Sequence, residues 1–178
     1  MNTKYINIAL HEYLPEKYLT RATYEEICMH YAVLDFKDGK ARAQEWAAKV
    51  VGKALSGKDR SNIVFVCVPA HSHCTYKKRY GKFSEKVCEI CGCQNGFPYV
   101  FVDKDERPMH LYARHHESNR LDNVILDADF FHGKNVIIFD DIITTGRTAA
   151  TMAELLGQCG ARVIGALFLA KTVHPRGR

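Results

Sequence analysis

Hydrophobic residues along this chain fall into two patterns, helical stripes and continuous apolar runs. Within residues 41–55 the apolar side chains step by three and one, which is typical of a helix with one buried face, and residues 21–34 read as a second helix. Continuous runs of β-forming residues at 63–69, 134–140 and 162–170 are typical of strands buried on both faces. Helices that alternate with such strands predict an α/β fold with an open, mainly parallel sheet flanked by helices.

Two further segments continue this alternation, and three others interrupt it. Residues 97–103 read as another strand, and residues 148–159 read as a helix closed by Gly157 and Gly160. Three segments are expected to form a small variable hood and flexible loops: 1–30, 70–96 and 104–123. No linker or repeat divides the sequence, so we expect one domain over residues 1–178.

The composition is that of an ordinary globular protein. Of the 178 residues 47% are hydrophobic and 25% are charged, which excludes wholesale disorder. The net charge of +5 suits an anionic ligand or nucleic acid, although lysines on a solvated face give the same total. No stretch approaches the roughly 18 apolar residues of a membrane span, and the first residues lack a signal-peptide pattern. We therefore expect a cytoplasmic protein that does not bind a membrane.

The stretch VIIFDDIITTGRTA, residues 136–149, carries the strongest chemical signal. It predicts a buried strand that ends on Asp140 and Asp141 and turns at once into a helix. In an open α/β sheet, ligands bind beyond the carboxyl ends of the strands. The amides at the start of a helix are unpaired and carry partial positive charge, so the turn predicts a phosphate site. Gly146 would let the backbone approach the phosphate, and the neighbouring threonines would add hydroxyl donors.

The two acids require a different partner, because carboxylates repel phosphate. Vicinal hydroxyls of a sugar suit them, since a carboxylate accepts hydrogen bonds from both hydroxyls of a diol. The pattern therefore predicts a ribose 5-phosphate ligand. The alternative is a helix cap at Asp141 and a turn residue at Asp140, but the apolar run, the acids and Thr-Thr-Gly-x-Thr occur together and in order.

This stretch closely resembles the phosphoribosyl-pyrophosphate (PRPP) signature of type I phosphoribosyltransferases. The resemblance implies that Asp140 and Asp141 hold the ribose hydroxyls. It implies that the turn holds the 5-phosphate through five residues: Thr144, Thr145, Gly146, Arg147 and Thr148. It further implies a type I phosphoribosyltransferase-like fold, a Mg²⁺ cofactor, and transfer of the phosphoribosyl group to a nitrogen acceptor with release of pyrophosphate. Family members that act on 6-oxopurines often carry an aspartate at the position of Thr144, which counts against a hypoxanthine-type enzyme.

Within that family the chain resembles the ComF-like (competence protein F) branch. The segments that carry this resemblance are LDFKDGKARAQEWAAKVVGKAL, VCVPAH, RYGKF, DNVILDADFFHGKNVIIFDDIITTGRTAATM and ARVIGALFLAKTVH. The branch usually has an N-terminal, cysteine-rich zinc element, and the N-terminal part of this sequence does not show one.

Other segments supply candidate contacts for pyrophosphate. The loop after the strand at 63–69 offers amides and a side chain at Pro69, Ala70 and His71. Departure of pyrophosphate needs its growing charge neutralised, and we expect Arg79 and Arg114 to do this. Further cations in the same segments are those of KKRYGK (77–82), His115, His116 and Arg120. Polar residues 104–120 are the expected lid that excludes water.

The cysteines suggest a second kind of site. Cys88, Cys91 and Cys93 are spaced closely enough to share a tetrahedral zinc, with Cys74 as the fourth ligand. In a reducing compartment the alternative is a cluster of free thiols.

The sequence leaves three alternatives to a phosphoribosyltransferase open. The first is a non-catalytic PRPP-binding regulator or DNA-uptake accessory protein, in which residues 77–82 would bind single-stranded nucleic acid. The second is an amidophosphoribosyltransferase-like enzyme that uses ammonia, and the third is a zinc-stabilised structural module. The acceptor is not identified by any residue, and the oligomeric state is open, with a homodimer as one outcome.

Overall fold

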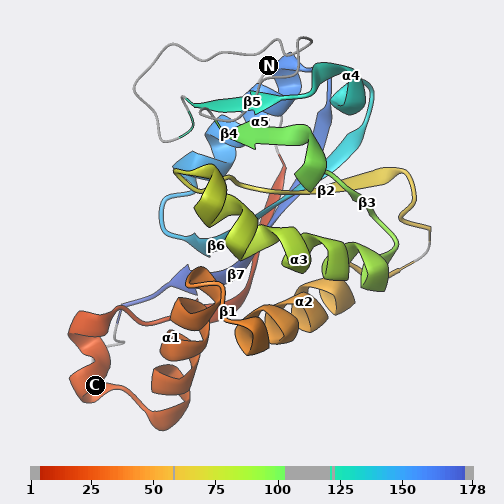
Figure 1. Ribbon diagram of the computed structural model, residues 1–178. Helices are drawn as coiled ribbons and strands as arrows, with labels where there is room; N and C mark the ends of the chain where they lie inside the picture. The colour runs from red at the N-terminus through yellow and green to blue at the C-terminus, as the bar shows by residue number, and fades with distance from the viewer. Residues whose placement is uncertain (1–4, 58, 103–120, 122, 175–178) are drawn as a thin grey trace.

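The structure, a computed structural model, describes residues 5–57, 59–102, 121 and 123–174 (Figure 1). Its strands are β1 (Ile6–Tyr13), β2 (Ile63–Cys67), β3 (Gln94–Asn95), β4 (Val100–Val102), β5 (Val124–Leu126), β6 (Asn135–Ile143) and β7 (Arg162–Thr172). Its helices are α1 (Tyr24–Lys37), α2 (Ala41–Leu55), α3 (His73–Cys91), α4 (Ala128–Phe131) and α5 (Arg147–Gln158), with 3-10 turns η1 (Glu16–Arg21) and η2 (Phe97–Tyr99).

The central sheet has five parallel strands in the order β1-β7-β6-β2-β3. Strands predicted at 63–69, 134–140 and 162–170 are β2, β6 and β7, the middle of this sheet. All three are apolar in sequence because neighbouring strands and helices cover both faces. The predicted fold class, an open parallel sheet flanked by helices, is confirmed.

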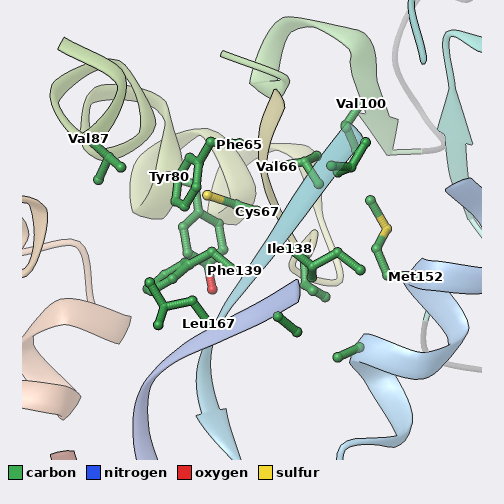
Figure 2. Close-up of a cluster of buried hydrophobic side chains, with 14 of the residues drawn as sticks. Phe65, Val66, Cys67, Tyr80, Val87, Val100, Ile138, Phe139, Met152 and Leu167 are labelled. Carbon is green, nitrogen blue, oxygen red and sulfur yellow. The ribbon is translucent and has the colours of Figure 1, made fainter. Parts of the chain in front are cut away.

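Alternate residues of β6 pack on opposite faces of the sheet. Phe139 contacts the rings of Phe36, Tyr80 and Phe83, so its face is covered by α1 and α3. Ile138 points the other way, towards Met152 of α5 (Figure 2). The core therefore lies in two layers, one on each side of β6 and β2.

Helices α2 and α3 pack against each other on one side of the sheet, and α5 lies against β6 and β7 on the other (Figure 1). Each of them buries one face and exposes the opposite one. Among the described helices, none is both long enough and apolar enough to cross a membrane.

The expectation of a loop over residues 70–96 is wrong, because α3 occupies most of it. Its buried residues include Tyr76, Tyr80, Phe83 and Val87, which recur at helical spacing and face the sheet. Ser72 caps its start by accepting a hydrogen bond from the amide of Thr75. Lysines between the aromatic residues lower the average hydropathy of the segment and hide this apolar stripe.

Two other expectations change in detail. Residues 1–30 were expected to belong to the hood, yet they include β1, which pairs in parallel with β7 at the edge of the central sheet. The strand predicted at 97–103 is shorter, and as β4 it pairs with β5 in a separate two-stranded antiparallel sheet. Sequence alternation alone does not distinguish the central sheet from a small accessory one.

Candidate active site

The chain leaves β2 and β6 in opposite directions along the sheet, and this determines where a ligand site is expected. From β2 the chain passes through α3 to β3 at one edge, whereas from β6 it passes through α5 to β7 on the other side. The order of strands therefore reverses between β2 and β6, and loops after these two strands diverge there. Such a switch point is where open α/β sheets bind their ligands.

A cavity of about 350 Å³ opens at this edge of the sheet. Its wall is formed by the ends of β1, β6 and β7, the start of α5 and the end of α1. The lining residues are Tyr13, Lys37, Asp140, Asp141, Ile142, Ile143, Thr144, Thr145, Gly146, Thr148, Ala149, Phe168 and Thr172. Most of the predicted PRPP signature therefore faces one cavity.

The turn at residues 144–146 forms one wall. Gly146 precedes α5 with a φ of 76°, the left-handed region that glycine adopts at little cost. Gly146 has no side chain with which to cap α5, and the amide of Arg147 donates to Oγ1 of Thr145 at a long 3.5 Å. The next residues of the helix, Thr148 and Ala149, line the cavity. The Thr144 hydroxyl hydrogen-bonds that of Thr172 at 3.1 Å, which ties the turn to the end of β7. Arg147 is exposed and is not part of the lining.

Strand β6 continues past the two acids, to Ile143, instead of ending at them. Ladder pairing with β7 extends to Ile143, so both aspartates are held in extended backbone. Side chains alternate along a strand, and the acids therefore point to opposite faces. Asp140 is on the side of Ile138 and is half-buried, whereas Asp141 is on the side of Phe139 and is buried.

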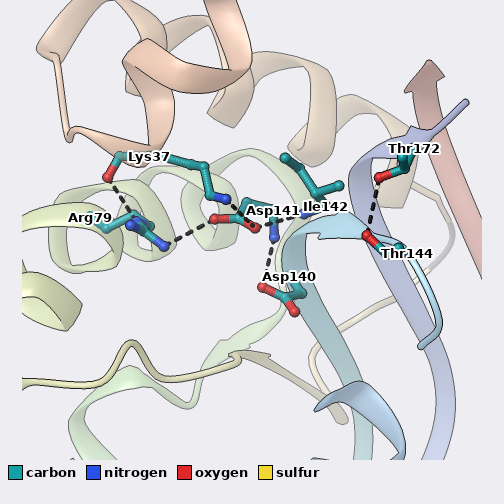
Figure 3. Close-up of polar contacts among 7 residues, drawn as sticks. All are labelled: Lys37, Arg79, Asp140, Asp141, Ile142, Thr144 and Thr172. Atoms are coloured by element: carbon teal, nitrogen blue, oxygen red, sulfur yellow. Dashed lines mark hydrogen bonds and ion pairs between the residues drawn. The ribbon is translucent and has the colours of Figure 1, made fainter. Parts of the chain in front are cut away.

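Asp141 belongs to a ring of contacts with two basic residues (Figure 3). The guanidinium of Arg79 donates from Nη1 to Oδ2 of Asp141 at 2.9 Å and from Nε to the backbone oxygen of Lys37 at 2.9 Å. The ammonium of Lys37 lies 3.9 Å from Oδ1 of Asp141, which closes the ring. Oδ1 also accepts a hydrogen bond from the amide of Ile142 at 2.7 Å. These contacts join α1, α3 and β6 behind the cavity.

Tyr13 brings a phenol to the same wall from the end of β1. Its ring stacks on His30, which hydrogen-bonds the backbone oxygen of Leu14 at 2.8 Å. Burial raises the pKa of Tyr13 above its usual value, with smaller contributions from the negative charges of Glu16 and Asp141. The phenol is therefore protonated at neutral pH and can donate a hydrogen bond into the cavity.

The predicted pyrophosphate loop lies beside the acids, as the parallel arrangement required. The amide of Val68 donates to the backbone oxygen of Phe139 at 2.8 Å, so residues 69–71 leave β2 directly next to Asp140. Pro69 and Ala70 are buried, and His71 is exposed. None of these three residues is part of the cavity lining.

The predicted cations are placed differently. Arg79 lies next to the cavity, but its guanidinium is bound to Asp141 and to Lys37 rather than open to a ligand. Four other predicted cations lie outside the described residues: Arg114, His115, His116 and Arg120. The predicted lid at 104–120 lies outside them as well.

Sequence reasoning missed Tyr13, Lys37, Phe168 and Thr172, which line the cavity. Tyr13 and Thr172 are the last residues of β1 and β7, and Asp140 lies three residues before the end of β6. Tyr13 and Thr172 could have been predicted from their positions near strand ends, because the ends of parallel strands meet at one edge of the sheet. That prediction requires knowing that β1 belongs to the sheet. Lys37 carried no local signal, because only the packing of α1 against α3 brings it to the cavity.

The predicted zinc site at Cys74, Cys88, Cys91 and Cys93 is wrong. Cys74 and Cys88 stand near opposite ends of α3, 88 − 74 = 14 residues apart, which is about 21 Å along a helix. Throughout the part of the chain that the structure describes, no group of three or more His, Cys, Asp or Glu is arranged to hold a metal. The thiols instead interact with one another: a hydrogen bond from Cys93 lowers the pKa of Cys91 to about 6.

Fold and site together define a class of protein, open parallel α/β proteins with a threonine- and glycine-containing turn between a central strand and a helix. Comparison with known families is specific: residues 32–177 match the phosphoribosyl transferase domain. The match covers most of the chain, and the protein belongs to this family, with a type I phosphoribosyltransferase domain.

Individual relatives match shorter parts. The chain is 50% identical over 46 residues to an adenine phosphoribosyltransferase of Mycolicibacterium smegmatis, 26% of each chain. It is 35% identical over 78 residues to one of Methylacidiphilum infernorum, 42% of this chain and 43% of that enzyme. The matches thus span less than half of these relatives. A crystal structure of adenine phosphoribosyltransferase from Thermoanaerobacter pseudethanolicus superposes with a TM-score of 0.52 at 20% identity, over 74% of this chain and 70% of the other, a likeness of fold.

Proposed function

We propose that the protein binds PRPP with Mg²⁺ and transfers its phosphoribosyl group to a nitrogen acceptor, releasing pyrophosphate. One observation carries this proposal: a single cavity joins the turn at residues 144–146 and the start of α5 to the carboxylate of Asp140. Amides at a helix start suit a phosphate, and a carboxylate suits a diol. Ribose 5-phosphate has both groups, and membership of the family supports the same ligand.

Binding would fix the two ends of the sugar separately. The 5-phosphate accepts hydrogen bonds from the amides that follow Gly146 and from the hydroxyls of Thr144, Thr145 and Thr148. Asp140 accepts hydrogen bonds from the ribose hydroxyls, with Asp141 beside it. Asp140 pairs with Phe168 of β7 and directly follows the last β6 residue that pairs with β2, so its backbone is held in place before the ligand arrives and needs little ordering on binding.

In the reaction the bond from C1 to the pyrophosphate oxygen breaks, and its electrons leave with that oxygen. A bond from C1 to the acceptor nitrogen forms, through a transition state with positive charge on the ribose ring, and the proton that this nitrogen loses passes to water or to the departing pyrophosphate. The carboxylate of Asp140 on the cavity wall stabilises that positive charge, whereas the charge of Asp141 is already balanced by Arg79.

Magnesium suits this cavity. Proteins bind Mg²⁺ through one or two carboxylates together with substrate phosphates and water, and the carboxylate of Asp140 is a donor of that kind. When bound with PRPP, the ion would neutralise charge on the departing pyrophosphate.

Pyrophosphate release in the presence of PRPP and Mg²⁺ tests the activity. Adenine is the first acceptor to try, because the relatives above are adenine phosphoribosyltransferases. Ammonia and other nitrogen bases complete the panel. We expect release with at least one acceptor and none with Asp140→Asn; absence of release with every acceptor, despite PRPP binding, would leave a non-catalytic PRPP-binding protein.

That non-catalytic alternative, in the ComF-like branch, has one observation of its own. Lys77, Lys78 and Lys82 are exposed on α3, the helix that also carries Arg79. Such lysines would bind the phosphates of single-stranded nucleic acid, with an affinity that falls steeply as salt rises. A filter-binding titration with single-stranded DNA at two salt concentrations, with and without PRPP, tests it. Salt-independent or undetectable binding would remove this alternative.

A further inference from the structure

The cavity has a marked asymmetry of charge. Among the described residues of its wall, Lys37 is the one basic side chain. The carboxylate of Asp141 already accepts a 2.9 Å hydrogen bond from Arg79, while the ammonium of Lys37 stands 3.9 Å away. That separation gives an ion pair without a hydrogen bond. The donors of Lys37 therefore remain available to a ligand.

The ring of contacts holds Lys37 at its backbone, through Arg79, and at its ammonium, through Asp141. Its backbone oxygen accepts from Nε of Arg79, at the last residue of α1. Gln44 of α2 in turn donates to the backbone oxygens of Lys78 and Arg79, at 2.7 and 2.8 Å. The ring carries two positive charges and one negative charge, so it leaves a net positive charge on this wall.

Lys37 and the phosphate turn lie on different sides of the acids. Figure 3 shows Thr144 and Thr172 on one side of Asp141 and Lys37 with Arg79 on the other. A ribose that places its 5-phosphate on the turn and its diol on Asp140 extends its C1 end away from the turn. The group attached to C1 of PRPP is the pyrophosphate, an anion that needs a cation there.

We propose that Lys37 binds the pyrophosphate group of PRPP and neutralises it as it leaves, with Arg79 as a positioning residue that fixes Lys37 and Asp141. This inference rests on the proposed function. It gives Lys37 the role that the sequence analysis expects of Arg79, the neutralisation of the departing pyrophosphate. The role of Lys37 requires no proton transfer from its ammonium, because the electrons of the broken bond stay on the pyrophosphate oxygen and the ammonium balances their charge.

Calorimetric titration of Lys37→Met with three ligands in Mg²⁺ tests the proposal: PRPP, ribose 5-phosphate and inorganic pyrophosphate. Loss of one charge-assisted contact should weaken PRPP and pyrophosphate binding by about 10- to 100-fold. Ribose 5-phosphate, which lacks the pyrophosphate, should change by no more than about twofold. Lys40→Met is the matched control, since Lys40 stands three residues away, is exposed and pairs with Asp35; all three affinities should stay at their wild-type values.

Each outcome decides something. Unchanged PRPP affinity in Lys37→Met, or an equal loss for ribose 5-phosphate, overturns the role of Lys37 and leaves the proposed function standing. A wild-type protein that binds neither PRPP nor ribose 5-phosphate overturns both. Unfolding curves of the variants are compared first, and Lys37→Gln replaces Lys37→Met if the latter does not fold; Lys37→Arg should recover part of the PRPP affinity.

Discussion

The two walls of the cavity are built in opposite ways. The turn from Thr144 to Thr148 is uncharged but for the exposed Arg147, and it is contiguous in sequence, so its amides and hydroxyls are set by local backbone geometry. The opposite wall is charged and is assembled from distant residues, with Arg79 and Asp141 62 positions apart and Arg79 and Lys37 42 positions apart. A contiguous turn tolerates changes in the rest of the fold, whereas the charged ring exists only when α1, α3 and β6 are packed together.

Because of this difference, substitutions in the two walls should affect different quantities, ligand affinity in one and the free energy of unfolding in the other. Groups on the turn and Asp140 face the cavity, so under the proposed function substitutions there should act mainly on PRPP affinity. Arg79 and Asp141 are largely buried and hold elements together, so substitutions there should act on the free energy of unfolding as well.

The largest effect is expected at Asp140. Asp140→Asn removes the charge that accepts two ribose hydroxyls and should weaken PRPP by about 100-fold or more, because each charge-assisted hydrogen bond contributes about 1.5–3 kcal/mol. Asparagine keeps the oxygen that accepts the 2.9 Å hydrogen bond from the amide of Asp141, so the melting temperature should stay within a few degrees of wild type. Calorimetry and thermal unfolding measure the two quantities, and a wild-type affinity would contradict the role of Asp140.

Arg79 should show the opposite behaviour. Arg79→Met leaves Asp141, which is 9% exposed, without its hydrogen-bonded cation, and should cost about 2–4 kcal/mol of unfolding free energy. Urea unfolding measures this loss. The control is Lys49→Met, which breaks an exposed ion pair with Glu45 and should cost less than about 1 kcal/mol. Equal losses in the two variants would show that the ring does not stabilise the fold.

Two glycines, Gly146 before α5 and Gly157 inside it, should respond to alanine with opposite changes in stability. Gly146→Ala places a side chain at a φ of 76° and should cost about 1–2 kcal/mol of stability, and PRPP affinity should fall because the amides shift. Gly157→Ala, inside α5 with nothing within 4 Å of the added carbon, should instead gain about 0.5 kcal/mol. Chemical unfolding checks both signs, and a stabilised Gly146→Ala would contradict the turn conformation.

The smallest effect concerns Tyr13. Its raised pKa comes from burial first and then from Glu16 and Asp141. Because the folded-state pKa lies above the unfolded one, the stability linked to this proton is fully present below the unfolded pKa and is lost as pH rises through the folded pKa. Ultraviolet titration of tyrosinate, as the difference between wild type and Tyr13→Phe, should show this raised pKa, and Asp141→Asn should lower it. No change in Asp141→Asn would mean that the carboxylate does not face the phenol.

Sequence alone was sufficient for the turn wall because its signal is local. The apolar run, the acids and the glycine predicted β6, the turn and the start of α5, and the structure differs only in extending β6 to Ile143. Apolar runs likewise predicted the middle of the sheet, where both faces are covered.

The charged wall could not be predicted, since its signal is long-range. Lysines interrupt the aromatic stripe of α3, and for this reason the sequence predicts a loop there. A loop could bring Cys74 to Cys88, whereas a helix keeps them apart. Arg79 lies next to the cavity, but its contacts with Lys37 and Asp141 depend on how α1, α3 and β6 pack.

A crystal structure with PRPP and Mg²⁺ tests the central claim most directly. We expect the 5-phosphate on the amides that follow Gly146, the ribose hydroxyls on Asp140 and the pyrophosphate towards Lys37. An empty cavity at saturating PRPP, or a 5-phosphate bound away from the start of α5, would contradict the account.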